Sequence, residues 1–340
     1  MTLRMIAALL LSLGVSLGTG PWLIRRLKKL HFGTVIYELG PAHQQKQGTP
    51  VMGGLMIALG TVICQAVLHP WNWKGMWDPA AGLLLISLGS MAVGFADDWI
   101  KAVKKRHEGL TPWQKIAGQV IVAAAFTCWC YFHPEIGSRI YVPFLHREWD
   151  LGIWYLPVMA LAVIFYVNST NLQDGLDGLL GTITTVSSAA WSMVILLSVY
   201  TLGLSMESVL PQSIFALGLV GGCVGYLRFN RYPARVFMGD TGSMFIGGAT
   251  VGLAMVTRQP LLLILIGICP ILSSVSVILQ RYYFKLTRRF SADHQGKRLF
   301  RMSPVHHHFE KKGYSETQIV SMYAGVTMIA GLIAVLSMLQ

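Results

Sequence analysis

Long apolar segments recur along the whole chain, and they constrain its fold more than any other feature. A helix needs about 20 apolar residues to cross the ~30 Å hydrocarbon core of a bilayer. Only 12% of the 340 residues are charged, which is about half the share in a soluble domain. We therefore predict an all-α polytopic membrane protein with about ten transmembrane helices in a single domain, residues 1–340. The predicted spans are 3–24, 50–69, 80–99, 113–132, 152–168, 178–200, 211–228, 237–257, 260–281 and 317–339.

The basic residues predict how the chain is oriented. With these ten spans, 22 of the 27 lysines and arginines fall in or beside the odd-numbered loops. Because cytoplasmic loops carry the excess of Lys and Arg, we predict that the odd-numbered loops are cytoplasmic and that both termini lie outside. The net charge of +12 then requires no nucleic-acid partner. We expect the connection between spans nine and ten to be the only one with room for a small additional element.

The unusual polar stretches of the chain all fall in the odd-numbered loops. We therefore expect them to meet on one membrane face, as a candidate active site on the cytoplasmic side. These stretches are QGTPVMGG, FADDWIK, NSTNLQDGLDGL, FNRYPARVFMGDTGS and RMSPVHHHFEKKG.

Acidic residues at the edge of a membrane span are costly, and by default they suggest a functional site. Asp97 and Asp98 end the third span. Adjacent residues on a helix point about 100° apart, so the two carboxylates are expected to have different roles. A solvated helix end is the alternative. Asp240 lies between two glycines at the start of span eight, where a carboxylate near a helix N-terminus suits Mg²⁺. A simple turn would use the same residues.

The stretch NSTNLQDGLDGL carries Asn168, Asn171, Asp174 and Asp177, each three residues apart. If the stretch is helical, these four side chains line one face and can bind a ligand together. The alternative is that Asp177 only caps the next helix.

The consecutive histidines His306, His307 and His308 suggest a metal site at first sight. Consecutive residues of a regular element cannot all face one ion, and the usual zinc spacings are absent. Phosphate hydrogen bonding or structural anchoring is therefore the favoured interpretation. The nine lysines and arginines of the same loop would attract anionic headgroups or a multiply charged substrate.

Phosphoryl transfer at the membrane surface accounts best for these groups together. Mg²⁺ neutralises a pyrophosphate, lysines hold it, and a carboxylate serves as base or nucleophile. A divalent-cation or anion transporter is an alternative, although transporters place their polar residues near the bilayer midplane. A structural scaffold would have no use for five interfacial aspartates.

At these motifs the chain closely resembles the family of bacterial phospho-N-acetylmuramoyl-pentapeptide-transferases, within the polyprenyl-phosphate N-acetylhexosamine-1-phosphate transferase superfamily. The DD, NLxDGLDG and GDxGS blocks resemble the whole superfamily, whereas GTPxMGG and the triple histidine are narrower. The resemblance implies transfer of phospho-MurNAc-pentapeptide from UDP-MurNAc-pentapeptide to undecaprenyl phosphate, giving lipid I and UMP. It also implies Mg²⁺, ten spans and a homodimer in the bacterial cytoplasmic (inner) membrane. A sibling transferase using another UDP-N-acetylhexosamine is the alternative.

The resemblance further implies roles for individual residues. Asp97 would deprotonate the lipid phosphate with Asp98 assisting, and Asp240 would be the main Mg²⁺ ligand. Asp174 and Asp177 would complete the metal-binding cluster. The catalytic set would include His306, His307 and His308, and the substrate-binding set would be Lys46, Thr49, Lys101, Lys105, Lys115, Asn168, Asn171, Leu172, Asp174, Gly175, Asp177, Asn230, Gln280 and Phe237, the last stacking on uracil.

The chain departs from the family pattern at three places. Tyr37 and Leu39 stand where a basic and an acidic residue are expected. Gln173 replaces the usual threonine of NLTDGLDGL. Residues 290–296 resemble an insertion that lengthens the connection between spans nine and ten.

Overall fold

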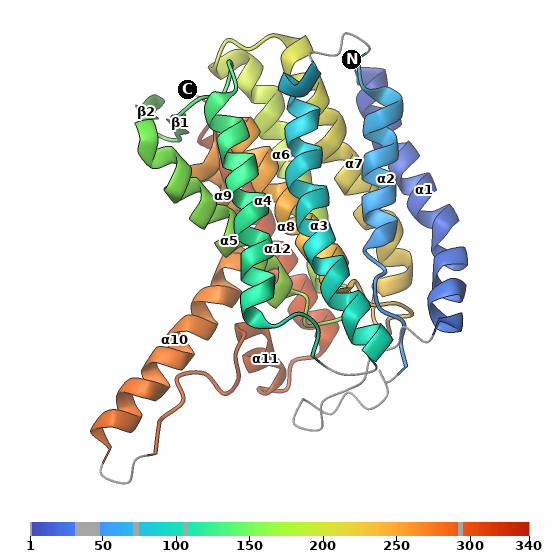
Figure 1. Cartoon of the computed structure of the whole chain (residues 1–340), viewed down its shortest axis with the longest axis vertical. Coiled ribbons are helices and arrows are strands. Elements are labelled where there is room, and N and C mark those ends of the chain that lie inside the picture. Colours follow the sequence, from blue (N-terminus) through green and yellow to red (C-terminus); the bar gives the residue numbers. More distant parts are fainter. Residues whose placement is uncertain (1, 31–47, 71–74, 105–107, 292–294, 340) are drawn as a thin grey trace.

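The computed structural model describes residues 2–30, 48–70, 75–104, 108–291 and 295–339, and over these the chain is nearly all α-helix (Figure 1). This confirms the predicted fold class. Each predicted span corresponds to one helix or to a broken helix. These helices are α1 (Thr2–Lys29), α2 (Leu55–Leu68), α3 (Pro79–Lys104), α4 (Pro112–Phe132), α5 (Tyr155–Gln173), α6 (Leu179–Thr201), α7 (Met206–Asn230), α8 (Gly239–Val256), the pair α9 (Leu263–Ile266) and α10 (Ile268–Phe290), and α12 (Glu316–Leu336).

Not all of these helices are long and apolar enough to cross a membrane by themselves. Within the described residues, seven helices are, and an eighth is counted if Pro260–Ile266 and Ile268–Phe290, bent by 82°, form one broken span. Helix α2 has only 14 residues. Helix α8 is rich in glycine, and every residue from Thr241 to Val256 is buried. Because α8 is surrounded by protein rather than lipid, its sequence does not need the hydropathy of a lipid-facing helix.

The chain termini and the polar motifs lie at opposite ends of the helical bundle. Helix α1 begins and α12 ends at the same end of the molecule (Figure 1). The C-terminal end of α3, the start of α8 and the short helix α11 (Val305–Glu310) lie at the opposite end. Both termini therefore share one side, as predicted, and the polar motifs gather at the other.

A small β-hairpin occupies the connection between α4 and α5. Strands β1 (Arg139–Val142) and β2 (Arg147–Asp150) pair antiparallel, and the hairpin lies at the same end of the bundle as the termini (Figure 1). Arg258 after α8 fastens it: its guanidinium lies 2.5 Å from the Glu148 carboxylate, and its carbonyl accepts the Tyr141 N–H at 2.7 Å.

The hairpin makes one prediction wrong. The connection between spans nine and ten holds α11, as expected, but it is not the only connection with an additional element. The strands are only four residues long, which is too short for a clear alternating pattern. Single-turn 3₁₀ helices at Gly75–Trp77, Gly152–Trp154 and Pro260–Leu262 complete the elements that the described residues form.

Glycines let the backbones of the central helices touch where α8 begins. A Cβ at Gly94 of α3 would lie 2.2 Å from the Asp240 carbonyl oxygen, and one at Gly54 would lie 2.1 Å from the Gly242 Cα. Inside a membrane the hydrophobic effect does not hold helices together, so helices associate through close van der Waals packing. Small residues at the contact make this close packing possible. Asp97 and Asp98 follow Gly94 by about one turn, so this contact brings their helix end against the start of α8.

Gly94→Ala is expected to lower thermal stability and to disturb the polar cluster described below. The added methyl group meets backbone that cannot rotate away, and overpacking of this kind costs about 1–3 kcal/mol. The measurement is thermal unfolding of the detergent-purified protein. Gly325→Ala in α12 is the matched control, since nothing lies within 4 Å of a Cβ there. Equal unfolding temperatures for the two variants would contradict the close contact of α3 with α8.

Candidate active site

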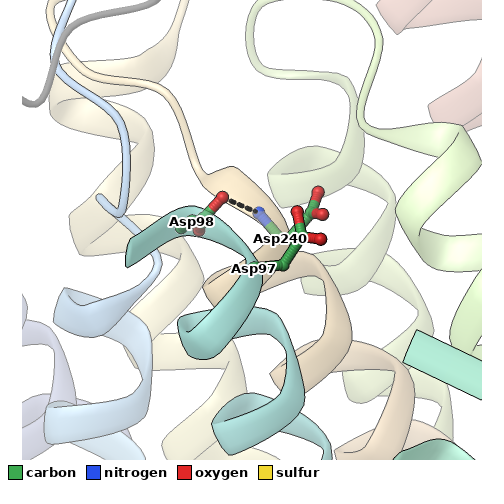
Figure 2. A group of neighbouring side chains, drawn as sticks. All are labelled: Asp97, Asp98 and Asp240. Carbon is green, nitrogen blue, oxygen red and sulfur yellow. Dashed lines mark hydrogen bonds between the residues drawn. The ribbon is translucent and has the colours of Figure 1, made fainter. Parts of the chain in front are cut away.

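Three carboxylates meet at the end of the bundle opposite the termini. Asp97 and Asp98 come from the last turns of α3, and Asp240 from the first turn of α8. One oxygen from each carboxylate lies within 4.8 Å of the other two (Figure 2). Residues more than 140 positions apart are thus brought into a group that could hold one cation, as the two motifs predicted.

Asp240 is the most heavily contacted of the three carboxylates. Its Oδ2 accepts from the ammonium groups of Lys115 at 2.9 Å and Lys101 at 3.2 Å. Its Oδ1 accepts from the Asn171 side-chain amide at 2.8 Å, and that amide also donates to Ser243 Oγ at 2.9 Å. Side chains from α3, α4 and α5 therefore converge on one residue of α8.

Asp97 lies beside Asp240, and the two carboxylates face the same space (Figure 2). The Lys101 ammonium is 2.5 Å from Asp97 Oδ2, and Oδ1 accepts the Leu110 N–H at 2.9 Å. Two lysines thus neutralise two adjacent carboxylates that are largely shielded from water. Because opposite charges attract strongly where water is scarce, these four side chains form a compact ionic cluster.

Asp98 points away from this cluster, toward the backbone at the start of α8 (Figure 2). It accepts hydrogen bonds from the Asp240 N–H and from both the N–H and the hydroxyl of Thr241. The different surroundings of Asp97 and Asp98 agree with the predicted 100° separation.

The four side chains of NSTNLQDGLDGL do not share one helix face. Helix α5 ends at Gln173, so Asn168 and Asn171 are helical while Asp174 and Asp177 lie in the turn before α6. Both glycines of the motif lie in this turn, and Gly178 has a φ of +77° that other residues rarely adopt. The alternative of an Asp177 cap is not found either, because α6 starts from Gly178 without a side-chain cap.

The turn after α5 lies close enough to Asp98 and Asp240 for their charges to act on it. Desolvation by the surrounding protein is the main cause that raises the pKa of Asp174 to about 8, and the nearby carboxylates of Asp240, Asp98 and Asp177 contribute to the same rise. Asp177 uses Oδ2 to accept the Ala234 N–H at 2.9 Å. Among the described residues, neither turn aspartate joins the group of three close carboxylates.

The three consecutive histidines face three different partners. His306 is fully buried, and its ring lies against Gly175, where a Cβ would be 2.3 Å from Nε2. Burial, together with the neighbouring His307, lowers the pKa of His306 to about 3, so its ring is neutral. His307 Nδ1 lies 2.9 Å from the Glu310 carboxylate, and His308 Nδ1 accepts the Arg301 N–H at 3.0 Å. The segment therefore docks on the turn after α5 instead of presenting three ligands to one ion.

Comparison with known proteins agrees with these features. The family model for Glycosyl transferase family 4 matches residues 80–258. A phospho-N-acetylmuramoyl-pentapeptide-transferase of Heliobacterium modesticaldum is 40% identical over 98% of this chain and 97% of its own length. Proteins of the same name from Caldanaerobacter subterraneus (40% identical, 96% of each chain) and Clostridium perfringens (39% identical, 98% of this chain and 97% of theirs) match equally broadly. The chain belongs to the phospho-N-acetylmuramoyl-pentapeptide-transferase family.

The family resemblance implied that several residues bind the nucleotide. The structure shows what some of these residues contact. Asn168 pairs with the side-chain amide of Gln119. Leu172 is exposed, and Thr49 and Phe237 are half-buried. The backbone of Phe237 pairs with Pro50 and Gly53, which joins the GTPVMGG stretch to the start of α8. Lys46 and Lys105, like Tyr37 and Leu39, lie outside the described residues.

Asn230 and Gln280 are both engaged by backbone groups. Asn230 is buried; it accepts the Gly178 N–H at 3.0 Å and donates to the Val236 carbonyl at 2.9 Å. Gln280 Oε1 accepts the N–H groups of Leu299 and Phe300. The two side chains hold the loops around the site.

Sequence reasoning missed several residues that support this transferase site. Thr241 and Ser243 belong to the quoted GDTGS block, so their motif was visible although their contacts were not. Glu316 accepts the Asp177 N–H at 2.9 Å, and no pattern marked it. The departure at Gln173 is structural: its Oε1 accepts the Ser273 hydroxyl at 2.5 Å in the buried contact with α10.

Proposed function

We propose that this chain transfers phospho-MurNAc-pentapeptide from UDP-MurNAc-pentapeptide to undecaprenyl phosphate, giving lipid I and UMP. The observation that carries the proposal is the convergence of the DD and GDTGS aspartates with two lysines. The chain is also about 40% identical, along nearly its whole length, to a phospho-N-acetylmuramoyl-pentapeptide-transferase. Lipid and nucleotide phosphates are the anions that such a cluster can hold.

Mg²⁺ fits the residues of the cluster. Carboxylate and amide oxygens are the ligands this ion prefers, and the lysines at Asp240 mark the position where positive charge is needed. Asp240 would hold the ion as its main ligand, with Asp174 and Asp177 of the adjacent turn completing the site. When bound, Mg²⁺ neutralises negative charge on the pyrophosphate and on the departing UMP.

The residues around the cluster have proposed roles in a direct in-line displacement. Asp97 is the base for the phosphate of the lipid acceptor, and the Leu110 N–H and Lys101 hold its two oxygens in place. Lys101 and Lys115 bind phosphate oxygens, which their flexible ammonium groups can reach from Asp240. An oxygen of the acceptor phosphate attacks the β-phosphorus of the UDP-sugar, and the bond to the UMP oxygen breaks.

The proposed setting is the bacterial cytoplasmic membrane with the active site facing the cytoplasm. The 22 lysines and arginines of the odd-numbered loops support this orientation. His306, His307 and His308 would cover the nucleotide side of the site, since α11 docks on the turn after α5. A homodimer is proposed from the family resemblance.

The proposed reaction predicts UMP release that requires three components. Purified protein given UDP-MurNAc-pentapeptide, undecaprenyl phosphate and Mg²⁺ is expected to release UMP and form a polyprenyl-linked product. Omission of any one component should abolish both. UDP-GlcNAc in place of the muramoyl substrate should give little product. Efficient use of UDP-GlcNAc would instead indicate a sibling transferase, and Mg²⁺ flux into liposomes without product would indicate a transporter.

The lysines at Asp240 predict opposite effects of two substitutions on Mg²⁺ binding. Asp240→Asn is expected to weaken binding at least tenfold and to lose activity that added Mg²⁺ restores only partly. Lys115→Gln removes an ammonium that competes for the same carboxylate, so it should tighten binding about threefold, a change of roughly 0.7 kcal/mol. Calorimetry on substrate-free protein measures the Mg²⁺ affinity of each variant.

Lys104→Gln is the control for loss of a positive charge, because Lys104 is exposed at the end of α3. Its affinity for Mg²⁺ should match that of the wild type. Unchanged Mg²⁺ affinity in Asp240→Asn would remove Asp240 from the proposed site.

A further inference from the structure

We propose that Asp98 is a positioning residue: it caps the N-terminus of α8 from the neighbouring helix α3, and so fixes Asp240 relative to Asp97. Asp98 acts through these two residues and binds neither the cation nor the substrate. The inference rests on the proposed function, since it assigns a role within that site.

Helix α8 lacks a cap from its own sequence. The first N–H groups of any helix have no partner within the helix and need an acceptor from elsewhere. The residue before α8, Met238, makes no side-chain cap hydrogen bond. Asp98 supplies the acceptors instead: Oδ1 accepts the Asp240 N–H at 3.2 Å, and Oδ2 accepts the Thr241 N–H at 2.8 Å and the Thr241 hydroxyl at 2.6 Å.

The glycine before Asp240 makes this close approach possible. Gly239 has a φ of +76°, and a Cβ there would lie 2.5 Å from Asp98 Oδ2 and 3.0 Å from the Met52 N atom. Any side chain at this position would push α3 away from α8. The order Gly-Asp-Thr thus gives the carboxylate of α3 room, a backbone donor at Asp240 and two donors at Thr241.

The hydrogen bonds leave Asp98 little capacity to bind a metal. A carboxylate has about four lone-pair sites for hydrogen bonds or metal ions. In Asp98 three of them are used, because Oδ2 accepts two hydrogen bonds and Oδ1 accepts one. Its side chain is buried, and its charge is balanced by the positive end of the helix dipole. Asp97 and Asp240, by contrast, direct their carboxylates toward one space (Figure 2). Both carboxylates also form ion pairs with lysines.

The cap couples the two helices at the point where their relative position matters. Asp98 is covalently adjacent to Asp97, so holding Asp98 on α8 also holds Asp97 beside Asp240. Gly94, one turn earlier, touches the Asp240 carbonyl from the same helix. Catalytic groups misplaced by about 1 Å can lose on the order of 100-fold in rate, so loss of the cap should lower turnover even where the cation still binds.

The test compares Asp98→Asn, Thr241→Val, the double variant and Asp240→Asn by UMP release and by calorimetric Mg²⁺ binding without substrates. In either orientation of its amide, asparagine places an NH₂ group against the Asp240 N–H or the Thr241 N–H, and two donors cannot pair. We expect Asp98→Asn to lower kcat at least tenfold while its Kd for Mg²⁺ stays within threefold of wild type. Asp240→Asn should weaken Mg²⁺ binding at least tenfold.

The double variant tests whether Asp98 and Thr241 act together. Thr241→Val removes the hydroxyl donor and should lower kcat about threefold, while Thr241→Ser keeps the hydroxyl and should resemble wild type. Because both residues act through one cap, the double variant should be no slower than Asp98→Asn alone. If Asp98→Asn does not fold, the Thr241 pair tests the same cap from α8, and equal rates for Thr241→Val and Thr241→Ser would overturn the proposal.

Three further results would overturn the inference: wild-type kcat in Asp98→Asn, loss of Mg²⁺ affinity as large as in Asp240→Asn, or additive losses in the double variant. Failure of the proposed function is a separate outcome. It would show as absence of Mg²⁺-dependent UMP release by the wild type, whereas the binding comparison among variants needs no substrate.

Discussion

The structure depends on the contact between the backbone of α3 and the first turn of α8. Because residue 94 is a glycine, the two helices approach so closely that a methyl group would not fit between them. In a bilayer this close packing replaces the hydrophobic effect as the force between helices. It also carries Asp97 and Asp98 to Asp240, so the contact that stabilises the fold builds the site.

Charges at this contact are neutralised by protein groups of two kinds. Lys101 and Lys115 meet the carboxylate of Asp240, and Lys101 also meets Asp97. Asp98 is stabilised by backbone N–H donors at the start of α8. A carboxylate that is left unpaired in such a place would be costly. The arrangement explains how a chain with few acids can hold several of them beside a membrane without unfolding.

The sequence was most informative where a pattern has one physical meaning. Apolar segments predicted the helices, and the separation of Asp97 from Asp98 by about 100° predicted their different surroundings. The hairpin Arg139–Asp150 was missed because its strands are too short to show alternation. The prediction of one shared helix face for Asn168 and Asp177 failed because α5 ends at Gln173, between them, and α6 starts only after Gly178. Partners such as Asp98 with Thr241, or Glu316 with Asp177, depend on helix packing, which one sequence does not encode locally.

The central claim is that the end of α3 and the start of α8 meet beside one cation site, with Asp97 next to the ion that Asp240 holds. Iron bound in place of Mg²⁺ generates radicals with ascorbate and peroxide, and these cleave the backbone close to the ion. The account predicts cuts near both Asp97 and Asp240, and excess Mg²⁺ should suppress them together. Cuts confined to one of the two segments, or cuts that excess Mg²⁺ leaves unchanged, would contradict it.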